Sequence, residues 1–308
     1  MNMQAIGRKI SALRKERDMT QVDLADKLGV TYQAVSSWER GNSMPDIAKL
    51  PDISQVLAVS IDELLENEKA IEIVKNVLSG QEATGIIPDL ETLADVAPIL
   101  KPSQVSSLAK QTSSATRGEK INVDGELLIQ LSCMLESEDL REIVLSCEDL
   151  DGKILKSIAP FMESEDLREV ALNCVNIKSK TIAAIACHME SEDLREIALR
   201  CEKIDATTIA SISCYMESED LREVALLCNS FDNKTLVSIA AFMESEDLKE
   251  VALRCENIDG ATIESIACHM ESEDLKEVAL RCENIDKKTI AAIAHYMDSD
   301  DLVDLLHN

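Results

Sequence analysis

The stretch "SEDLREIALRCEKIDATTIASISCYME", residues 191–217, decides the fold because the chain repeats it. At intervals of 27 residues, its acidic phrase "ESEDL", finally written "DSDDL", begins at Glu136, Glu163, Glu190, Glu217, Glu244, Glu271 and Asp298. Apolar residues follow the phrase at i, i+3, i+4 and i+7, the spacing of one helix face: Leu194, Ile197, Ala198 and Cys201. A fixed period of this kind predicts a repeat architecture.

Each unit is predicted to be a pair of short helices. Ser191 is the expected N-cap of the first, with Glu192 and Asp193 in its first turn. Asp205 is the expected N-cap of the second, whose inward positions are Ile209, Ile212, Ser213 and Met216. One hairpin cannot bury both faces, so neighbours must stack. The array resembles the HEAT class of α-solenoids, although those repeats are longer, at roughly 40–47 residues.

The array is expected to begin before the first acidic phrase. Residues 88–100 repeat the second-helix pattern and residues 101–112 the first, in degenerate form. Asp89 and Asp124 are 35 residues apart, eight more than the period. We expect the extra residues to form a protruding loop at 112–120.

Composition favours closely packed helices. The chain is 45% hydrophobic but only 2% aromatic, with 9 glycines, and so is expected to be all-α. Six of the ten cysteines keep the 27-residue register, which indicates small buried side chains in a reducing compartment. Neither a leader nor an apolar stretch of membrane-spanning length is visible, so we expect a soluble, cytoplasmic protein without a membrane partner.

Charge is distributed unevenly along the chain. Residues 1–60 carry 8 Lys and Arg against 7 Asp and Glu, a net charge of +1. Residues 61–308 carry 23 against 51, a net charge of −28. Contact with an anionic partner is therefore expected in the first sixty residues.

The segment "MTQVDLADKLGVTYQAVSSWERG" (19–41) predicts two helices joined by a tight turn. Thr20 and Thr31 are good N-caps, Gly29 allows the turn, and Gly41 ends the second helix. Helix, turn with glycine, and helix is the pattern of the helix-turn-helix motif.

With "PDIAKLPDISQVLAVSIDELL" (45–65) following, this segment resembles the Cro-type phage repressors and the XRE family of bacterial DNA-binding domains. The resemblance spans about residues 6–65, and its matching features include Gln21, Ala25, Gly29 and the "WERG" of 38–41. It implies a five-helix, lambda-repressor-like domain at 1–66. A helical linker at 67–86 and the array at 87–308 would follow.

The family places its third helix in the major groove of DNA. By resemblance, the residues facing base edges are Tyr32, Gln33, Ser36 and Ser37, although the two serines could equally be solvated. Thr31 and Gln21 would lie near phosphates, with Arg40 and Asn42 as further backbone contacts.

Three other residues of this domain have structural interpretations. Trp38 is expected in the core. By resemblance, Arg14 could pair with Glu39, as the matching positions of family members do, instead of contacting DNA. Pro51 should kink the fourth helix or delay its start.

A near-neutral domain attracts phosphate weakly. Members of the family that it resembles bind as dimers to two half-sites, so the resemblance implies a homodimer on a palindromic double-stranded operator. The last repeat has Val303 where the others have Arg or Lys. We therefore predict that Val303, Leu305 and Leu306 contribute to dimerisation.

A second row of residues lies two positions before each acidic phrase: Met134, Phe161, His188, Tyr215, Phe242, His269 and Tyr296. This row either binds a basic peptide or protein beside the acids or seals one repeat against the next. The basic residues after each phrase, from Arg141 to Lys276, are candidates for pairing with acids of a neighbouring unit. Cys187 with His188 and Cys268 with His269 lack zinc-site spacing, so no metal is expected.

No GxxxxGK[ST], GxGxxG or HExxH motif occurs, so we expect neither an enzyme nor a cofactor. The sequence predicts a sequence-specific, dimeric transcriptional repressor whose acidic array mediates dimerisation and partner or signal recognition. One alternative is an interaction scaffold with a vestigial helix-turn-helix. Another is a peptide-responsive regulator resembling the quorum-sensing receptors of Gram-positive bacteria, whose repeats are longer.

Overall fold

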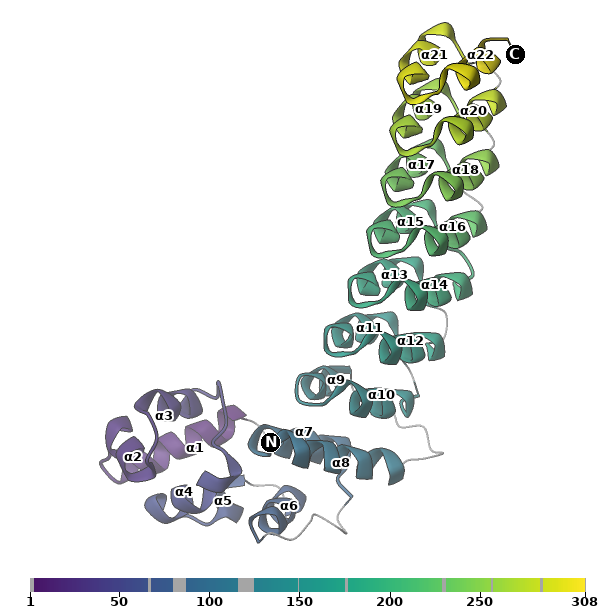
Figure 1. Ribbon diagram of the computed structural model, residues 1–308. Helices are drawn as coiled ribbons and strands as arrows, with labels where there is room; N and C mark the ends of the chain where they lie inside the picture. Colours follow the sequence, from purple (N-terminus) through teal and green to yellow (C-terminus); the bar gives the residue numbers. More distant parts are fainter. Residues whose placement is uncertain are drawn as a thin grey trace. The chain divides into compact units, whose positions relative to one another are not determined.

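The computed structural model describes residues 3–65, 68–79, 87–115, 125–148, 150–174, 177–228, 231–255, 257–282 and 285–307. Every regular element among these residues is a helix, which confirms the all-α prediction (Figure 1). Contacts divide the chain into two compact units, Met1–Asp149 and Leu150–Asn308.

The first unit opens with the predicted five-helix domain. Ile10, Leu24, Val35 and Leu50 are fully buried in its core, and Trp38 is only 6% exposed, which confirms its predicted packing role. The helices are α1 (Met3–Glu16), α2 (Gln21–Leu28), α3 (Tyr32–Glu39), the 3-10 turn η1 (Ile47–Lys49), α4 (Leu50–Leu57) and α5 (Ile61–Leu65).

Pro51 delays the fourth helix, as predicted. A 3-10 turn comes first, and α4 begins at Leu50, which places the proline in the first turn. The missing N–H of proline costs nothing there, because the first N–H groups of a helix have no intrahelical acceptor.

Two further elements extend this core beyond residue 65. Val74 of α6 (Glu68–Leu78) and Ile99 of the 3-10 turn η2 (Ala97–Ile99) are buried in the same cluster as Leu57. The segment predicted as a linker therefore contributes core side chains, and the boundaries at 66 and 86 stay a prediction.

The first unit also contains two helix pairs of the array: α7 (Leu90–Val96) with α8 (Pro102–Ala115), and α9 (Gly125–Ser132) with α10 (Ser137–Leu145). Asp89 caps α7 by accepting from Thr92 N–H at 2.8 Å. The loop predicted at 112–120 is wrong for its first four residues, which lengthen α8. The Thr112 hydroxyl binds Leu108 O and Pro88 O, both at 3.0 Å, and this anchors the extra turn. Residues 116–120 lie outside the described residues.

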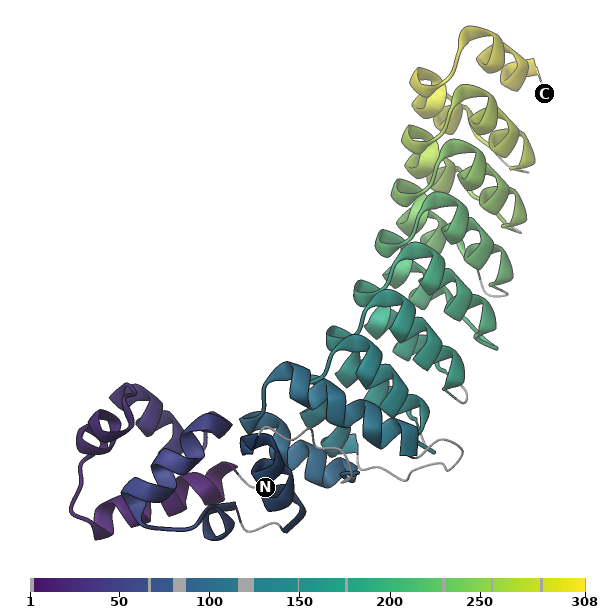
Figure 2. The same cartoon turned by 60° about the horizontal axis from the view of Figure 1, so that its bottom comes forward.

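The second unit is a stack of helix pairs (Figures 1 and 2). In each pair a seven-residue helix runs into a 3-10 turn, and a longer helix follows. Odd-numbered helices pack on odd-numbered neighbours and even on even, which confirms the HEAT-like solenoid. The pairs are α11 (Gly152–Ile158) with α12 (Ser164–Asn173), α13 (Ser179–Ile185) with α14 (Ser191–Arg200), α15 (Ala206–Ile212) with α16 (Ser218–Leu227), α17 (Asn233–Ile239) with α18 (Ser245–Arg254), α19 (Gly260–Ile266) with α20 (Ser272–Arg281), and α21 (Lys287–Ile293) with α22 (Ser299–His307).

The predicted inward residues are buried. Leu194, Ile197, Ile209 and Ile212 have no exposed surface, and Met216 is 8% exposed. The cysteines on the repeat register are buried or half-buried free thiols, as the sequence predicted.

The prediction that Ser191 caps its own helix is wrong. The N-cap is Glu190, and Ser191 is the first helical residue. The Ser191 hydroxyl instead accepts from Glu217 N–H of the next repeat at 2.7 Å and donates to Asp220. Because the repeats stack, the start of the next long helix lies close enough to form hydrogen bonds with this hydroxyl. The Asp205 cap is confirmed, because its carboxylate accepts from Thr208 N–H at 2.8 Å.

The basic residue after the phrase forms a connection between repeats. Arg168 Nη1 lies 2.8 Å from Asp193 Oδ1, and Lys249 Nζ lies 2.7 Å from Asp274 Oδ1. Equivalent pairs join Arg195 to Asp220, Arg222 to Asp247 and Lys276 to Asp301. The predicted pairing with neighbouring units is thus confirmed at these five residues.

Among the described residues, no helix is both long enough and apolar enough to cross a membrane.

Candidate nucleic-acid interface

Local hydrogen bonds fix the start of α2 and both ends of the turn between α2 and α3. Thr20 and Asp23 form a capping box at the start of α2, with Thr20 N–H 2.8 Å from Asp23 Oδ2. Gly29 ends α2 in the left-handed region, at φ 63°. Thr31 then caps α3 by accepting from Ala34 N–H at 3.3 Å. The sequence therefore folds into helix, turn and helix through its own caps.

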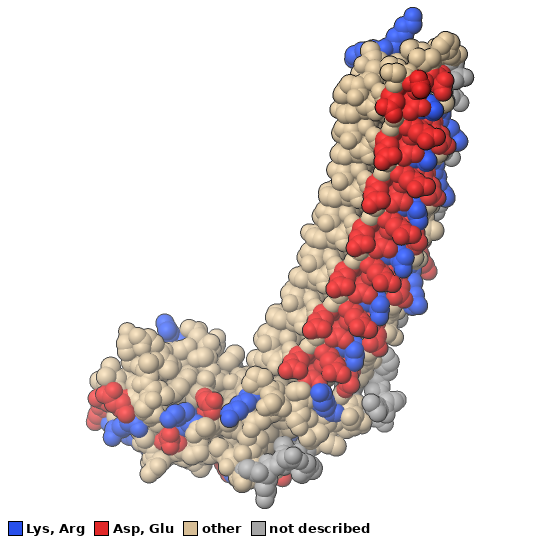
Figure 3. Space-filling view, viewed as in Figure 1, with Lys and Arg blue, Asp and Glu red and all other residues tan. Residues whose placement is uncertain are grey.

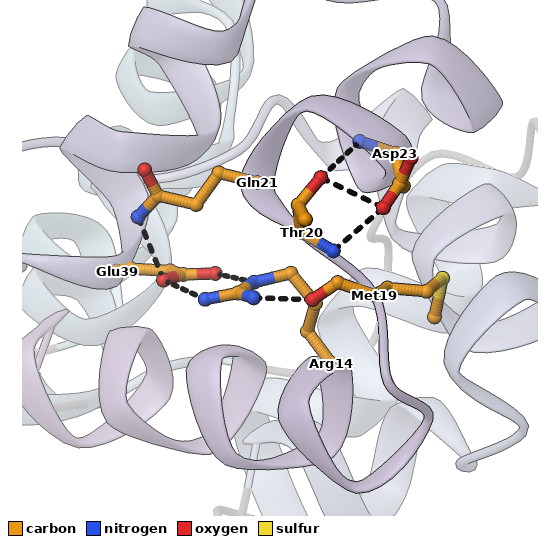
Figure 4. A network of polar contacts seen from close by, with 6 residues as sticks. All are labelled: Arg14, Met19, Thr20, Gln21, Asp23 and Glu39. Carbon is orange, nitrogen blue, oxygen red and sulfur yellow. Dashed lines mark hydrogen bonds and ion pairs between the residues drawn. The ribbon is translucent and has the colours of Figure 1, made fainter.

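A buried polar network holds α1, α2 and α3 together (Figure 4). Arg14 Nη2 donates to Glu39 Oε2 at 2.8 Å, and Gln21 Nε2 donates to the same oxygen at 2.9 Å. Arg14 also donates to Met19 O, and it is only 7% exposed. Arg14 therefore has a structural role, which confirms the predicted pairing with Glu39.

The network sets the pKa of Glu39. Burial raises its pKa, but hydrogen bonds from Arg14, Gln21 and Ser11 outweigh burial and keep the pKa below its ordinary value. The carboxylate thus stays charged at neutral pH and keeps α3 bound to Arg14.

The predicted base-contacting residues lie on the outer side of α3. Tyr32 is 53% exposed and Gln33 is also exposed, whereas Val35 and Trp38 face the core. Ser36 and Ser37 are half-buried, one turn further along the same side. Helical spacing therefore gathers these four side chains on one surface.

The loop after α3 folds back onto that helix. Arg40 Nε donates to Ser36 O at 3.1 Å, and Asn42 N–H donates to Ser37 O at 3.0 Å. The Ser43 hydroxyl donates to the Ser37 hydroxyl at 2.8 Å. Arg40 and Asn42 remain exposed at the end of α3, where backbone contacts were predicted. Sequence reasoning missed Ser43, because its bond depends on the path of the turn.

Gln21 has a structural role that the sequence did not reveal. Its amide nitrogen holds α2 against α3 through Glu39, 18 residues away. An amide nitrogen carries two hydrogens, so one remains for a phosphate. Thr31 also keeps its hydroxyl hydrogen while its oxygen caps α3.

Known proteins share this region of the chain. The helix-turn-helix family HTH_3 matches residues 10–64. YazB, an uncharacterized HTH-type transcriptional regulator of Bacillus subtilis strain 168, is 39% identical over 69 residues, which cover 22% of this chain and 100% of YazB. The chain belongs to the helix-turn-helix family.

Other likenesses to this helix-turn-helix protein are partial. The uncharacterized HTH-type transcriptional regulator YqaE of the same organism is 38% identical over 79 residues, which cover 26% of this chain and 64% of YqaE. A solved structure of Bacillus thuringiensis PlcR with the peptide PapR7 and DNA aligns with 99% of this chain and 97% of that chain, at 12% identity and a TM-score of 0.20. At that TM-score, the alignment supports no inference about the array.

The helix-turn-helix protein has a second set of predicted site residues, on its array. Each is the last residue of a 3-10 turn, from η3 (Ala159–Phe161) to η8 (Ala294–Tyr296). The rings are partly packed and partly accessible: Phe161 is 41% exposed, Tyr215 42%, Phe242 42% and Tyr296 38%, and His188 and His269 are half-buried.

The residues predicted for dimerisation differ from one another. Val303 is 48% exposed and Leu306 60% exposed on α22. Leu305 is only 4% exposed and packs inside the array, which corrects its prediction as a contact residue. Val303 and Leu306 lie two and one positions away from it, outside the inward stripe.

Proposed function

We propose that this protein is a sequence-specific regulator of transcription that binds double-stranded DNA with α3 in the major groove. One observation carries the proposal: the buried Arg14–Glu39–Gln21 network fixes α3 against α1 and α2 while Tyr32 and Gln33 face outward. A rigid helix with exposed polar and aromatic side chains suits base recognition. Membership of the helix-turn-helix family supports it.

Each exposed residue has a role in this proposal. Gln33 suits a bidentate hydrogen bond to adenine, and the Tyr32 ring suits contact with a thymine methyl group. Thr31 and the N-terminus of α2, with Gln21, suit phosphate oxygens. Arg40 and Asn42 add backbone contacts at the other end of α3, and Ser36 and Ser37 lie between.

The proposal includes a homodimer on a palindromic operator in the bacterial cytoplasm, and no catalytic step. A domain with a net charge of +1 gains little from phosphate attraction, so a second copy is needed for tight binding. Dimeric readers bind half-sites about 34 Å apart. The exposed Val303 and Leu306 offer apolar surface for self-association.

Selection of bound fragments from random double-stranded DNA with the full chain tests the proposal. The full chain is required because Val74 and Ile99 complete the core of the helix-turn-helix domain. We expect a palindromic site with adenine at the position read by Gln33. Enrichment without symmetry would contradict the dimer, and loss of the preferred adenine in the Gln33→Ala variant would assign the contact.

A scaffold with a vestigial helix-turn-helix is the second candidate, favoured by the net charge of −28 over residues 61–308. Absence of any enriched sequence at low salt would support the scaffold and contradict the regulator.

A further inference from the structure

The Phe and Tyr rings of the second unit keep more accessible surface than the residues that follow them. The methionines that follow the Phe, Tyr and His rings are more deeply buried, since Met162, Met189, Met216, Met243 and Met270 are each 8% exposed. The preceding Phe and Tyr rings keep about two fifths of their surface accessible, with 42% for Tyr215 and 42% for Phe242, and the two histidines of the row are half-buried. Their accessible part is therefore left for another molecule.

Exposed carboxylates flank this row of rings. The residue after each methionine is an exposed glutamate, and a second follows two positions later: the side chains of Glu192 and Glu219 are 84% and 77% exposed. Figure 3 shows Asp and Glu side chains gathered in a column along the stack, with Lys and Arg between and beside them. Rings and carboxylates thus run side by side along the array.

The basic residues of the array do not neutralise this column. Arg168 contacts Glu165 at 3.7 Å, Asp193 at 2.8 Å and Glu196 at 3.6 Å, so one guanidinium is shared by three carboxylates. The segment from each phrase to the second residue after it contains four acids and at most one base, as in Glu217–Glu223. A cationic partner would meet unbalanced negative charge beside aromatic faces.

We propose that this surface binds an extended, basic segment of a partner protein with Lys or Arg at every third residue. Helix layers repeat at roughly 10 Å. A chain in the extended polyproline II conformation rises about 3.1 Å per residue with three residues per turn, so every third side chain lies on the same side and advances by about one repeat. Each cation would then lie beside one ring and one pair of glutamates, an arrangement that favours Lys and Arg. The proposal concerns the array alone and does not depend on DNA binding.

The test measures binding of the full chain to a fluorescent synthetic peptide of six Lys-Ser-Ser triplets. A second peptide has the same composition but places its six lysines together. We expect the spaced peptide to bind more tightly than the clustered one, because only the spaced lysines match the repeats. Binding should weaken as salt rises.

Variants separate the rings from general acidity. Two exposed cation–π contacts are worth a factor of about 5 to 30 together, so Tyr215→Ala with Phe242→Ala should weaken the spaced peptide by that factor. Leu227→Ala is the matched control, since Leu227 is 53% exposed at the end of α16 and should leave binding unchanged. Circular dichroism would verify that each variant keeps its helices.

Three results would overturn the proposal: no binding of the spaced peptide at low salt, equal binding of both peptides, or equal binding by the ring variant and the Leu227→Ala control. None of them bears on the DNA selection, so a failure here is distinguishable from a failure of the proposed function.

Discussion

Arg222 on α16 and Asp247 on α18 are joined by an ion pair of 2.8 Å, and the hydroxyl of Ser218 binds the other oxygen of the same carboxylate. The Asp247 side chain is only 13% exposed, so this carboxylate depends on both partners. The acidic phrase is therefore a connector between repeats as well as a helix start.

Replacing this carboxylate should destabilise the array. Asp247→Ala leaves Ser218 and Arg222 without their shared acceptor, and we expect a loss of about 1–3 kcal/mol in the free energy of unfolding. Glu246→Ala removes an exposed neighbour of the same charge and should change that free energy by less than about 0.5 kcal/mol. Urea unfolding followed by circular dichroism measures both, and equal effects would contradict the connector role.

The aspartate caps predict a fall in stability at low pH. Hydrogen bonds from the hydroxyl and N–H of Thr235 lower the pKa of Asp232, and those from Thr262 lower the pKa of Asp259. A folded pKa below the unfolded value, about 3.9, means that the stabilisation is complete above that pH and is lost as the pH falls through the folded pKa.

Asparagine caps a helix about as well as aspartate but does not titrate. The double variant Asp232→Asn, Asp259→Asn should therefore lose less stability than the unmodified protein when unfolding is measured at pH 6 and again at pH 3. Parallel losses in the two proteins would show that these caps carry no pH dependence.

Gly7 lies where the backbones of α1 and α3 approach each other closely. A Cβ added there would lie 2.1 Å from Trp38 O, so we expect Gly7→Ala to cost about 3 kcal/mol despite the better helix propensity of alanine. At Gly29 no atom would lie within 4 Å, and only the positive φ opposes a side chain, at a cost of about 1–2 kcal/mol for Gly29→Ala. Thermal unfolding of the two variants measures both losses of stability. A larger loss for Gly29→Ala than for Gly7→Ala would contradict the prediction.

Substitution of a residue that contacts a base and substitution of one that contacts the DNA backbone should have different effects on DNA binding. Gln33→Ala should weaken binding by about 1–3 kcal/mol and relax the preference at one base pair. Arg40→Ala should weaken binding to every sequence alike and reduce the slope of log affinity against log salt by about 1. Titrations at several salt concentrations distinguish the two, and a change of sequence preference in Arg40→Ala would contradict its assignment.

Local signals explain why much of the fold was predictable. Thr20, Thr31 and Asp205 cap helices through bonds to residues only three positions away. The late start of α4 follows from the fixed φ of Pro51. Burial of Leu194 and Ile197 follows from their spacing, which places them on one face of the helix. The 27-residue period gives every repeat the same apolar face, and stacking of neighbouring repeats buries it.

Long-range contacts explain the errors. Ser191 has the chemistry of an N-cap, but it binds Asp220, 29 positions away. Thr112 was predicted to begin a loop, but its hydroxyl donates to Pro88 O, 24 positions earlier, and the residue lies in α8. No local pattern contains these partners.

By itself, the sequence determined most of the helices, the caps at Thr20, Thr31 and Asp205 and the helix-turn-helix, because each depends on residues within one or two turns of one another. It also determined the solenoid period, because the same pattern recurs every 27 residues. Only the tertiary structure decided which side chains are hydrogen-bonded or buried within the protein and which are exposed. Gln21 is bound by Glu39 and Leu305 is buried, whereas Tyr32, Gln33 and the rings from Phe161 to Tyr296 keep accessible surface. The physical reason is that packing brings together groups about 18 to 29 positions apart, and hydrogen bonding and exposure are set by those neighbours.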